Sequence, residues 1–165
     1  MRELTRRALD RLSAVLRAAI VILAVTMLAA LSLQIFMRFV VGQALSWSEE
    51  LALACFSWST LLAIALGVRD AIHVRMDLLV DQLPAPFREG IDRLIAFVVS
   101  GLGVFIAWAG VRYVIDSLGT TSAAIGYPIA YLYACAPVCG ALIALFSLER
   151  AVFGAPPSQA EKVAV

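Results

Sequence analysis

Four long runs of uncharged, mostly apolar residues follow one another along the chain, and charged residues are confined to the bands between them. The runs occupy residues 18–37, 51–68, 94–111 and 117–148. Because a helix needs about 20 apolar residues to cross a bilayer, the first three runs each match one crossing. The fourth is longer; its first part predicts a loop, and Pro128 suits the first turn of the last helix. The pattern predicts an all-α integral membrane protein with four membrane-spanning helices, over about residues 18–40, 47–68, 87–112 and 128–149.

The second helix has the most strongly marked start, Ser46-Trp47-Ser48-Glu49-Glu50-Leu51. Ser46 and Glu49 have the spacing of a capping box, and Trp47 lies where an interfacial aromatic residue is expected. Adjacent helical residues point about 100° apart, so Glu49 and Glu50 cannot serve one purpose. We expect Glu49 to cap the helix.

The partner of Glu50 is left open by the sequence. One alternative is an internal ion pair with Arg38, at the end of the first span. The other is that Glu50, with Trp47 and Trp58, contacts a partner protein. Both readings place these residues at a subunit interface or in a structural role.

The connection between spans two and three predicts an amphipathic helix lying along the membrane interface. In helical form, one side carries Asp70, His73, Asp77 and Asp81, while the opposite side is apolar. His73 and Asp77, four residues apart, have metal-ligand spacing, but no second histidine or cysteine is near. We interpret them as part of a solvated polar face, and no metal site is predicted.

The N-terminal band is basic and amphipathic, with arginines at positions 2, 6, 7, 11 and 17. We expect it to lie on the membrane surface before the chain turns inward. A signal peptide also begins with basic residues, but its apolar core is about 7–15 residues and ends at a small-residue site. Here the core is longer and no convincing site follows, so cleavage is not expected.

Orientation follows from the positions of lysine and arginine. With four spans, eleven of the thirteen basic residues fall on the side of the two termini and the middle connection. That side is predicted to be cytoplasmic, so Glu49 and Glu50 face outward. We predict a single membrane domain over residues 1–153 and a disordered cytoplasmic tail over 154–165.

Small residues recur on one side of the third span, at Gly103, Ala107 and Gly110, which predicts close approach of another helix. The fourth span has a similar stripe in which Pro137 is able to bend the helix. The stripe consists of Ala130, Ala134, Pro137 and Ala141.

The inventory of reactive groups is small. Hydrophobic residues make up 62% of the chain and charged ones 15%, against about 25% in soluble domains. A single histidine excludes a bis-histidine haem within this chain, and the three cysteines suit small buried residues. No phosphate loop or nucleophile elbow is present, and no charge lies near the middle of a span, where ion-coupled carriers usually place one. The sequence predicts neither an enzyme nor a cofactor-binding or nucleic-acid-binding protein.

An ordered set of residues between positions 38 and 84 resembles the small membrane subunit of tripartite ATP-independent periplasmic (TRAP) transporters of bacteria and archaea. The rest of the chain agrees in length and span count, although the charges around His73 follow their own pattern. The set is Arg38-Phe39, Ser46-Trp47-Ser48-Glu49-Glu50-Leu51, Phe56-Ser57-Trp58, Gly67, His73, Asp77 and Leu83-Pro84.

This resemblance implies a division of labour. In that family a large multi-span subunit carries sodium and substrate, usually an organic acid, and a periplasmic binding protein delivers the substrate. The small subunit lies in the bacterial inner membrane, braces the large one and has no substrate site. Two alternatives are a stand-alone four-span exporter, which would need a carboxylate deep in its first span, and the membrane anchor of a redox complex.

Overall fold

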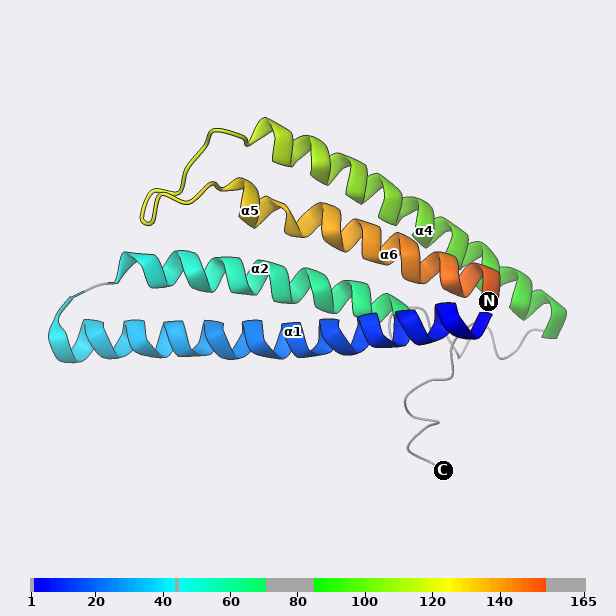
Figure 1. Cartoon of the computed structure of the whole chain (residues 1–165), viewed down its shortest axis with the longest axis horizontal. Helices are drawn as coiled ribbons and strands as arrows, with labels where there is room; N and C mark the ends of the chain where they lie inside the picture. Colours follow the sequence, from blue (N-terminus) through cyan, green and yellow to red (C-terminus); the bar gives the residue numbers. More distant parts are fainter. Residues whose placement is uncertain (1, 44, 71–84, 154–165) are drawn as a thin grey trace, which may run out of the picture. The chain divides into compact units, whose positions relative to one another are not determined.

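The computed structural model describes residues 2–43, 45–70 and 85–153, and these are almost entirely helical (Figure 1). The predicted interfacial helix, with His73 and Asp77, and the predicted tail over 154–165 lie outside the described residues. The elements are α1 (Arg2–Phe36), η1 (Met37–Val41), α2 (Ser46–Arg69), α4 (Ala85–Asp116), α5 (Ala130–Tyr133) and α6 (Cys135–Phe153).

Within the described residues, four stretches are long and apolar enough to cross a membrane, which confirms the predicted all-α fold with four spans. They are Arg7–Val41, Ser46–Arg69, Gly90–Asp116 and Ala130–Val152. The cytoplasmic placement of both termini stays a prediction.

Contacts divide the chain into two units, which are described separately. The first combines Met1–Ala63 with Arg112–Cys135, and the second combines Ile64–Val111 with Ala136–Val165. Both α2 and α4 therefore contribute one part to each unit. The single membrane domain expected over residues 1–153 stays a prediction.

The basic N-terminal band and the first span form one unbroken helix. α1 and η1 together run from Arg2 to Val41, about 60 Å at 1.5 Å per residue, or roughly twice the hydrocarbon thickness of a bilayer. The expectation of a separate surface helix followed by an inward turn is therefore wrong. The helix ends at Gly42, whose left-handed φ of 77° suits glycine and whose N–H donates to the carbonyl of Met37.

In the second unit α4 and α6 pack with their backbones in close contact. A Cβ added to Gly140 would lie 2.4 Å from the amide nitrogen of Ala107, and one added to Gly103 would lie 2.6 Å from that of Ala144. Ser100 adds a hydrogen bond of 3.2 Å from its hydroxyl to the Ala144 carbonyl. The close approach predicted from Gly103, Ala107 and Gly110 is confirmed, because glycine alone leaves room for this spacing.

The contact surface on α6 differs from the predicted stripe. Pro137 belongs to it, since a Cβ on Gly110 would lie 2.7 Å from the proline ring. Ala141, however, is exposed, and Gly140 and Ala144 take its place. The last span is interrupted at Ala134, and α6 begins at Cys135, so Pro137 lies in the first turn of α6 and not within a continuous helix. The N–H that proline lacks is not needed there, because the first turn of a helix has no intrahelical acceptor for it.

The three cysteines are buried small residues, as predicted. Cys55, Cys135 and Cys139 are 5%, 6% and 2% exposed, and none of the three forms a disulfide. By contrast, much of the apolar surface of α1 and α4 is exposed, which is what helices in contact with lipid or with another membrane subunit show.

Candidate functional site at the start of α2

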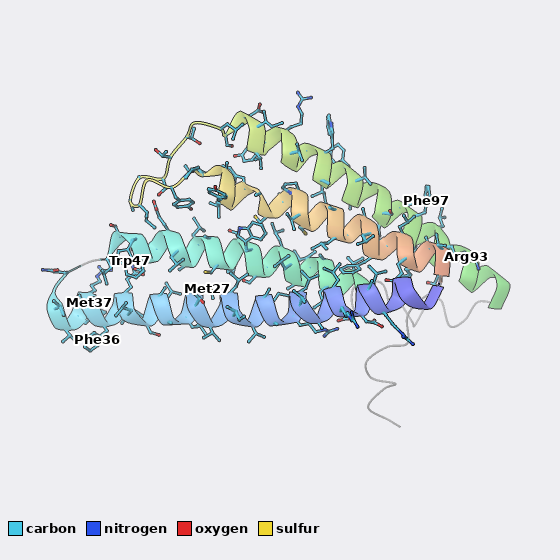
Figure 2. All side chains as sticks on the ribbon, in the orientation of Figure 1. Met27, Phe36, Met37, Trp47, Arg93 and Phe97 are labelled. Carbon is cyan, nitrogen blue, oxygen red and sulfur yellow. The ribbon has the colours of Figure 1, made fainter. Side chains whose placement is uncertain are left out.

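The first turn of α2 is held by Ser48, which is fully buried. Its hydroxyl and its amide both donate to the carbonyl of Leu45, at 2.7 and 3.3 Å. Trp47, 39% exposed, lies on the same turn, and Figure 2 shows it at the end of α2 nearest to Met37 of η1. The turn thus buries its small polar residue and exposes its aromatic one, as expected where a helix enters a membrane.

Glu49 connects α2 to α1. Its Oε1 accepts a hydrogen bond of 2.6 Å from the side-chain amide of Gln34, in the last turn of α1. A capping-box glutamate would instead accept from the backbone N–H of Ser46. Among the described residues Gln34 is the partner of this carboxylate, so the expected capping role is replaced by a bond between helices.

Glu50 connects α2 to the loop over residues 117–129, called here the 117–129 loop. Its carboxylate accepts hydrogen bonds from the hydroxyl of Ser122 and from the amides of Ala124, at 2.9 Å, and Ile125, at 3.2 Å. Ser122 is only 9% exposed. Three donors on one carboxylate form a strong, directional clamp, because hydrogen bonds to charged acceptors are about twice as strong as neutral ones.

The 117–129 loop is shaped to present these donors. The Ser122 amide donates to the Tyr127 carbonyl at 2.9 Å, and the Ile129 amide donates to the Thr120 carbonyl at 3.1 Å, so the loop doubles back on itself. Gly126, with φ of 75°, allows the reversal. The turn between Ser122 and Gly126 directs two backbone amides toward the carboxylate, in the manner of an anion-binding nest.

Tyr127 lies next to this clamp. Burial raises the pKa of Tyr127, and the negative charge of Glu50 raises it further. Two further contacts tie α2 and α4 to the segment after the loop. The indole N–H of Trp58 donates to the Tyr131 carbonyl at 3.2 Å, and the rings of Tyr113 and Tyr133 meet edge to face at 4.6 Å.

The structure separates the predicted site residues into two groups. Glu49, Glu50 and Trp58 have partners within this chain, whereas Arg38 and Trp47 are exposed. No hydrogen bond or ion pair of Arg38 occurs among the described residues. Of the two alternatives for Glu50, the pair with Arg38 is not formed among the described residues, and the carboxylate is occupied by the loop donors. His73 and Asp77 lie outside the described residues.

Sequence reasoning missed the residues that complete the site. Ser122 lies 72 positions after Glu50, and the Ala124 and Ile125 contributions come from backbone amides, which leave no trace in residue type. Gln34 was noticeable as a polar side chain within an apolar run. The hydrogen bonds of Glu50 hold the 117–129 loop in position. No group of three or more metal-ligating side chains occurs in the part of the chain that the structure describes.

A second polar cluster lies in the second unit, where α2 and α6 end. Arg69 Nε lies 3.7 Å from Glu149 Oε2, and both side chains are 7% exposed. The guanidinium also lies over the ring of Phe146, 5.4 Å from its centre. Arg69 directly follows the uncharged run over residues 51–68, and in the structure it is buried and paired.

Three comparisons bear on identity. The family model of the DctQ component of tripartite ATP-independent periplasmic transporters matches residues 27–155. The chain is 31% identical over 121 residues to the C4-dicarboxylate TRAP transporter small permease protein DctQ of Rhodobacter capsulatus, covering 68% of this chain and 50% of that protein. It is 28% identical over 133 residues to the ectoine TRAP transporter small permease protein TeaB of Halomonas elongata, covering 79% of this chain and 69% of that protein.

These matches include most of the chain, although it spans only half the length of the first relative. They agree with the four apolar helices and with the ordered residues that begin at Arg38. The chain therefore belongs to the family of the DctQ component of tripartite ATP-independent periplasmic transporters, multi-pass proteins of the inner membrane that serve as small permease subunits and not as enzymes.

Proposed function

We propose that this chain braces a large multi-span transport subunit within a sodium-coupled carrier that takes up organic acids from a periplasmic binding protein. One observation carries the bracing role: the four uncharged runs place every charge of the spans at or near their ends. Ion-coupled carriers need ionisable groups or broken helices near the middle of the membrane. The transport site is then supplied by another chain.

The relatives support this division. The two matched proteins are named for different substrates, C4-dicarboxylate and ectoine, although this chain is similarly identical to both. Similar identity to two small subunits with different substrates argues against a role of this chain in substrate selection. We assign the choice of organic acid to the large subunit and the binding protein.

The large apolar surfaces of α1 and α4 suit a bracing role. Residues exposed along α4 include Phe97, Phe105 and Trp108, at 69%, 60% and 57%. Only 11% of the most apolar window of the first span and 17% of that of the third are buried within the chain. Such helices are stable in lipid and can also pack against a second membrane subunit without desolvating polar groups.

With both termini in the cytoplasm, the Glu50 clamp and the 117–129 loop face the periplasm. Leu118 and Ile125 of this loop are 65% and 50% exposed. A fixed loop with exposed apolar side chains suits contact with a docked binding protein, and the clamp would keep it in one conformation.

Reconstitution tests this function. The purified chain alone in liposomes, under an inward sodium gradient, is expected to take up no organic acid. Addition of the large subunit and the binding protein is expected to restore uptake, and the same mixture without this chain serves as the matched control. Uptake by this chain alone would overturn the bracing role and favour a stand-alone carrier, while full uptake without it would show that bracing is dispensable.

A further inference from the structure

The aromatic residues that carry a polar atom are gathered in the first unit. All four tyrosines and two of the three tryptophans belong to it, and only Trp108 lies in the second unit. Tyrosine and tryptophan are enriched where a membrane meets water, because the ring favours the apolar side and the polar atom favours the aqueous side. Their distribution therefore bears on how this unit meets the membrane surface.

Three of these six side chains are half-buried and have partners within the unit. The indole N–H of Trp58 donates to the Tyr131 carbonyl at 3.2 Å. The ring of Tyr133 meets that of Tyr113 edge to face at 4.6 Å, and Tyr127 lies beside the clamp. Packing within the chain accounts for Trp58, Tyr127 and Tyr133, and it leaves the other three rings to be explained.

The other three rings, those of Trp47, Tyr113 and Tyr131, are exposed by 39%, 55% and 69%. They come from three elements: the first turn of α2, the last turn of α4, and α5. Figure 2 shows Trp47 at the end of α2. Such a ring is poorly placed wholly in hydrocarbon, where its polar atom finds no partner, and poorly placed wholly in water. A surrounding with an apolar part and a polar part suits it best.

Charged residues flank the exposed rings of α2 and α4. Arg112 and Asp116, both exposed, lie one residue before and three residues after Tyr113, and the uncharged run of this helix ends just before them. Trp47 lies two residues before Glu49, at the corresponding end of α2. Both rings are therefore placed where an apolar helix surface gives way to charge. A layer of phospholipid headgroups offers charges of both signs and ester carbonyls at this depth.

We propose that the exposed rings of Trp47, Tyr113 and Tyr131 bind the phospholipid headgroup layer and set the depth of the first unit in the bilayer. With both termini in the cytoplasm, this layer belongs to the outer leaflet. The 117–129 loop connects the helix of Tyr113 to Tyr131, so it then projects from the headgroup layer toward water. The proposal concerns the lipid surface and does not depend on what the carrier transports.

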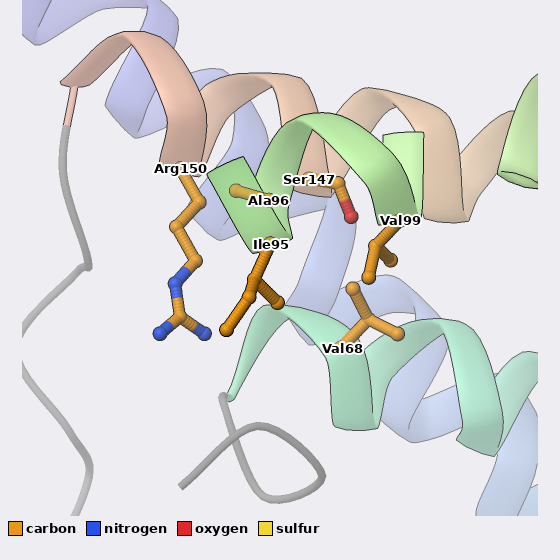
Figure 3. A pocket seen from close by; sticks show the side chains of 6 residues that line it. All are labelled: Val68, Ile95, Ala96, Val99, Ser147 and Arg150. Carbon is orange, nitrogen blue, oxygen red and sulfur yellow. The ribbon is translucent and has the colours of Figure 1, made fainter. Parts of the chain in front are cut away.

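The place in the second unit where α2 and α6 end differs in kind. Figure 3 shows a hollow there with room for about one water molecule. It is lined by aliphatic side chains, by a serine and by an arginine, and by no tyrosine or tryptophan: Val68, Ile95, Ala96, Val99, Ser147 and Arg150. Arginine, which reaches the headgroups with a long apolar stem, takes the place of aromatic rings at this end.

Depth-dependent fluorescence quenching of the full chain in liposomes tests the proposal. The lipids carry a nitroxide quencher either at the headgroup or near the end of an acyl chain. Trp47 is observed directly in the variant Trp108→Phe. Tyr113→Trp and Tyr131→Trp are observed in a chain that also carries Trp47→Phe and Trp108→Phe. Trp58 is kept because it bonds to the backbone of Tyr131, and its emission in the chain without the other tryptophans is subtracted.

The three positions are expected to be quenched several-fold more by the headgroup nitroxide than by the chain-end nitroxide. Leu102→Trp is the matched control: Leu102 is 55% exposed in the middle of the uncharged run of α4, and the opposite preference is expected there. Trp47 is a native residue, so its result stands even if a tyrosine variant fails to fold.

The same measurement is repeated after assembly with the large subunit and the binding protein, where the headgroup preference is expected to persist at all three positions. The proposal is overturned if the three positions behave like Leu102→Trp. It is also overturned if only an aqueous quencher reaches them, or if assembly abolishes quenching by lipid, which would assign these rings to a protein partner.

Discussion

The carboxylate of Glu50, in the first turn of α2, accepts a hydrogen bond from the hydroxyl of Ser122, 72 residues later in the chain. Two backbone amides of the same loop, those of Ala124 and Ile125, complete the set of donors. One side chain thus fixes the conformation of a segment that the four-span pattern left as a simple connection. The neighbouring Glu49 points to Gln34 of α1, so two adjacent carboxylates hold two different parts of the first unit.

Glu50→Gln is expected to reduce both thermal stability and transport by the assembled carrier, by more than Glu49→Gln does. Glutamine replaces one acceptor oxygen with a donor, which at position 50 would then face a donor of the 117–129 loop. At position 49 the remaining amide oxygen can still accept the single hydrogen bond from Gln34, so only the charge is lost. Melting temperature and initial uptake rate, compared at equal membrane levels, measure the difference. Equal behaviour of the two variants would contradict the clamp.

The double change Arg38→Glu with Glu50→Arg separates the two explanations of Glu50. Because no ion pair of Arg38 occurs among the described residues, the swap is expected to behave like the Glu50 change alone. Ser122→Ala is expected to reproduce part of the loss. Restored uptake in the swapped chain would show that Arg38 and Glu50 pair in the working carrier.

Helix geometry explains which parts of this site were predictable. The angle of about 100° between successive residues of a helix separates the roles of Glu49 and Glu50 without any tertiary information. Their partners depend on how distant segments fold together, and two of the donors to Glu50 are backbone amides, for which any residue serves. The capping box was a sound local inference that a tertiary contact with Gln34 displaced.

The packing of α4 on α6 shows the same limit. The face of α4 that carries small residues can be predicted from their helical spacing in the sequence. Gly140 and Ala141 of α6 are both small, however, and only the rotation of α6 about its axis decides which of them contacts α4. Likewise, the sequence shows that Arg69 follows the uncharged run over residues 51–68. Its burial could not be predicted, because its partner Glu149 lies on another helix.

Gly140→Ala is expected to destabilise the second unit. The new Cβ would lie 2.4 Å from the Ala107 nitrogen and 2.7 Å from the Gly103 oxygen, both backbone atoms, so the helices must move apart. Overpacking of this kind costs about 1–3 kcal/mol. Gly101→Ala, on the partner helix α4, is the matched control, because nothing lies within 4 Å of a Cβ at that position. Chemical unfolding in detergent measures both, and a similar loss in the control would contradict the close contact.

Arg69→Met is expected to destabilise the protein, by up to about 3–5 kcal/mol, because it removes one charge of a buried pair whose atoms lie 3.7 Å apart. The double variant Arg69→Met, Glu149→Leu should recover much of this loss, since both buried charges are gone. Unfolding free energies of the two single variants and the double variant form a thermodynamic cycle. Additive effects would show that the two side chains do not interact.

The pKa of Tyr127 is expected to fall toward its ordinary value when Glu50 is changed to glutamine, because one of the two causes of its increase is removed. Phenolate absorbance during alkaline titration measures this, with Tyr127→Phe identifying the contribution of this residue. A raised pKa in the folded state means that Tyr127 stays protonated after its unfolded form has ionised. Its contribution to stability is therefore complete below about pH 10 and is lost as pH rises through the folded value. An unchanged titration in Glu50→Gln would place the two groups farther apart.

The last prediction concerns orientation, on which the periplasmic role of the Glu50 clamp depends. Single cysteines are introduced at Gln43, at Thr120 and at Asp81 in a chain whose three native cysteines have been replaced. Eleven of thirteen basic residues lie on the side of the termini, so positions 43 and 120 are expected to react with a membrane-impermeant reagent in intact cells. Position 81 is expected to react only after the membrane is opened. Met1 and Val165, tested in the same way, should behave like position 81. Labelling of position 81 from outside together with positions 43 and 120 would invalidate the four-span topology. Labelling of position 81 and both termini, but not of 43 and 120, would invert it and move the clamp to the cytoplasm.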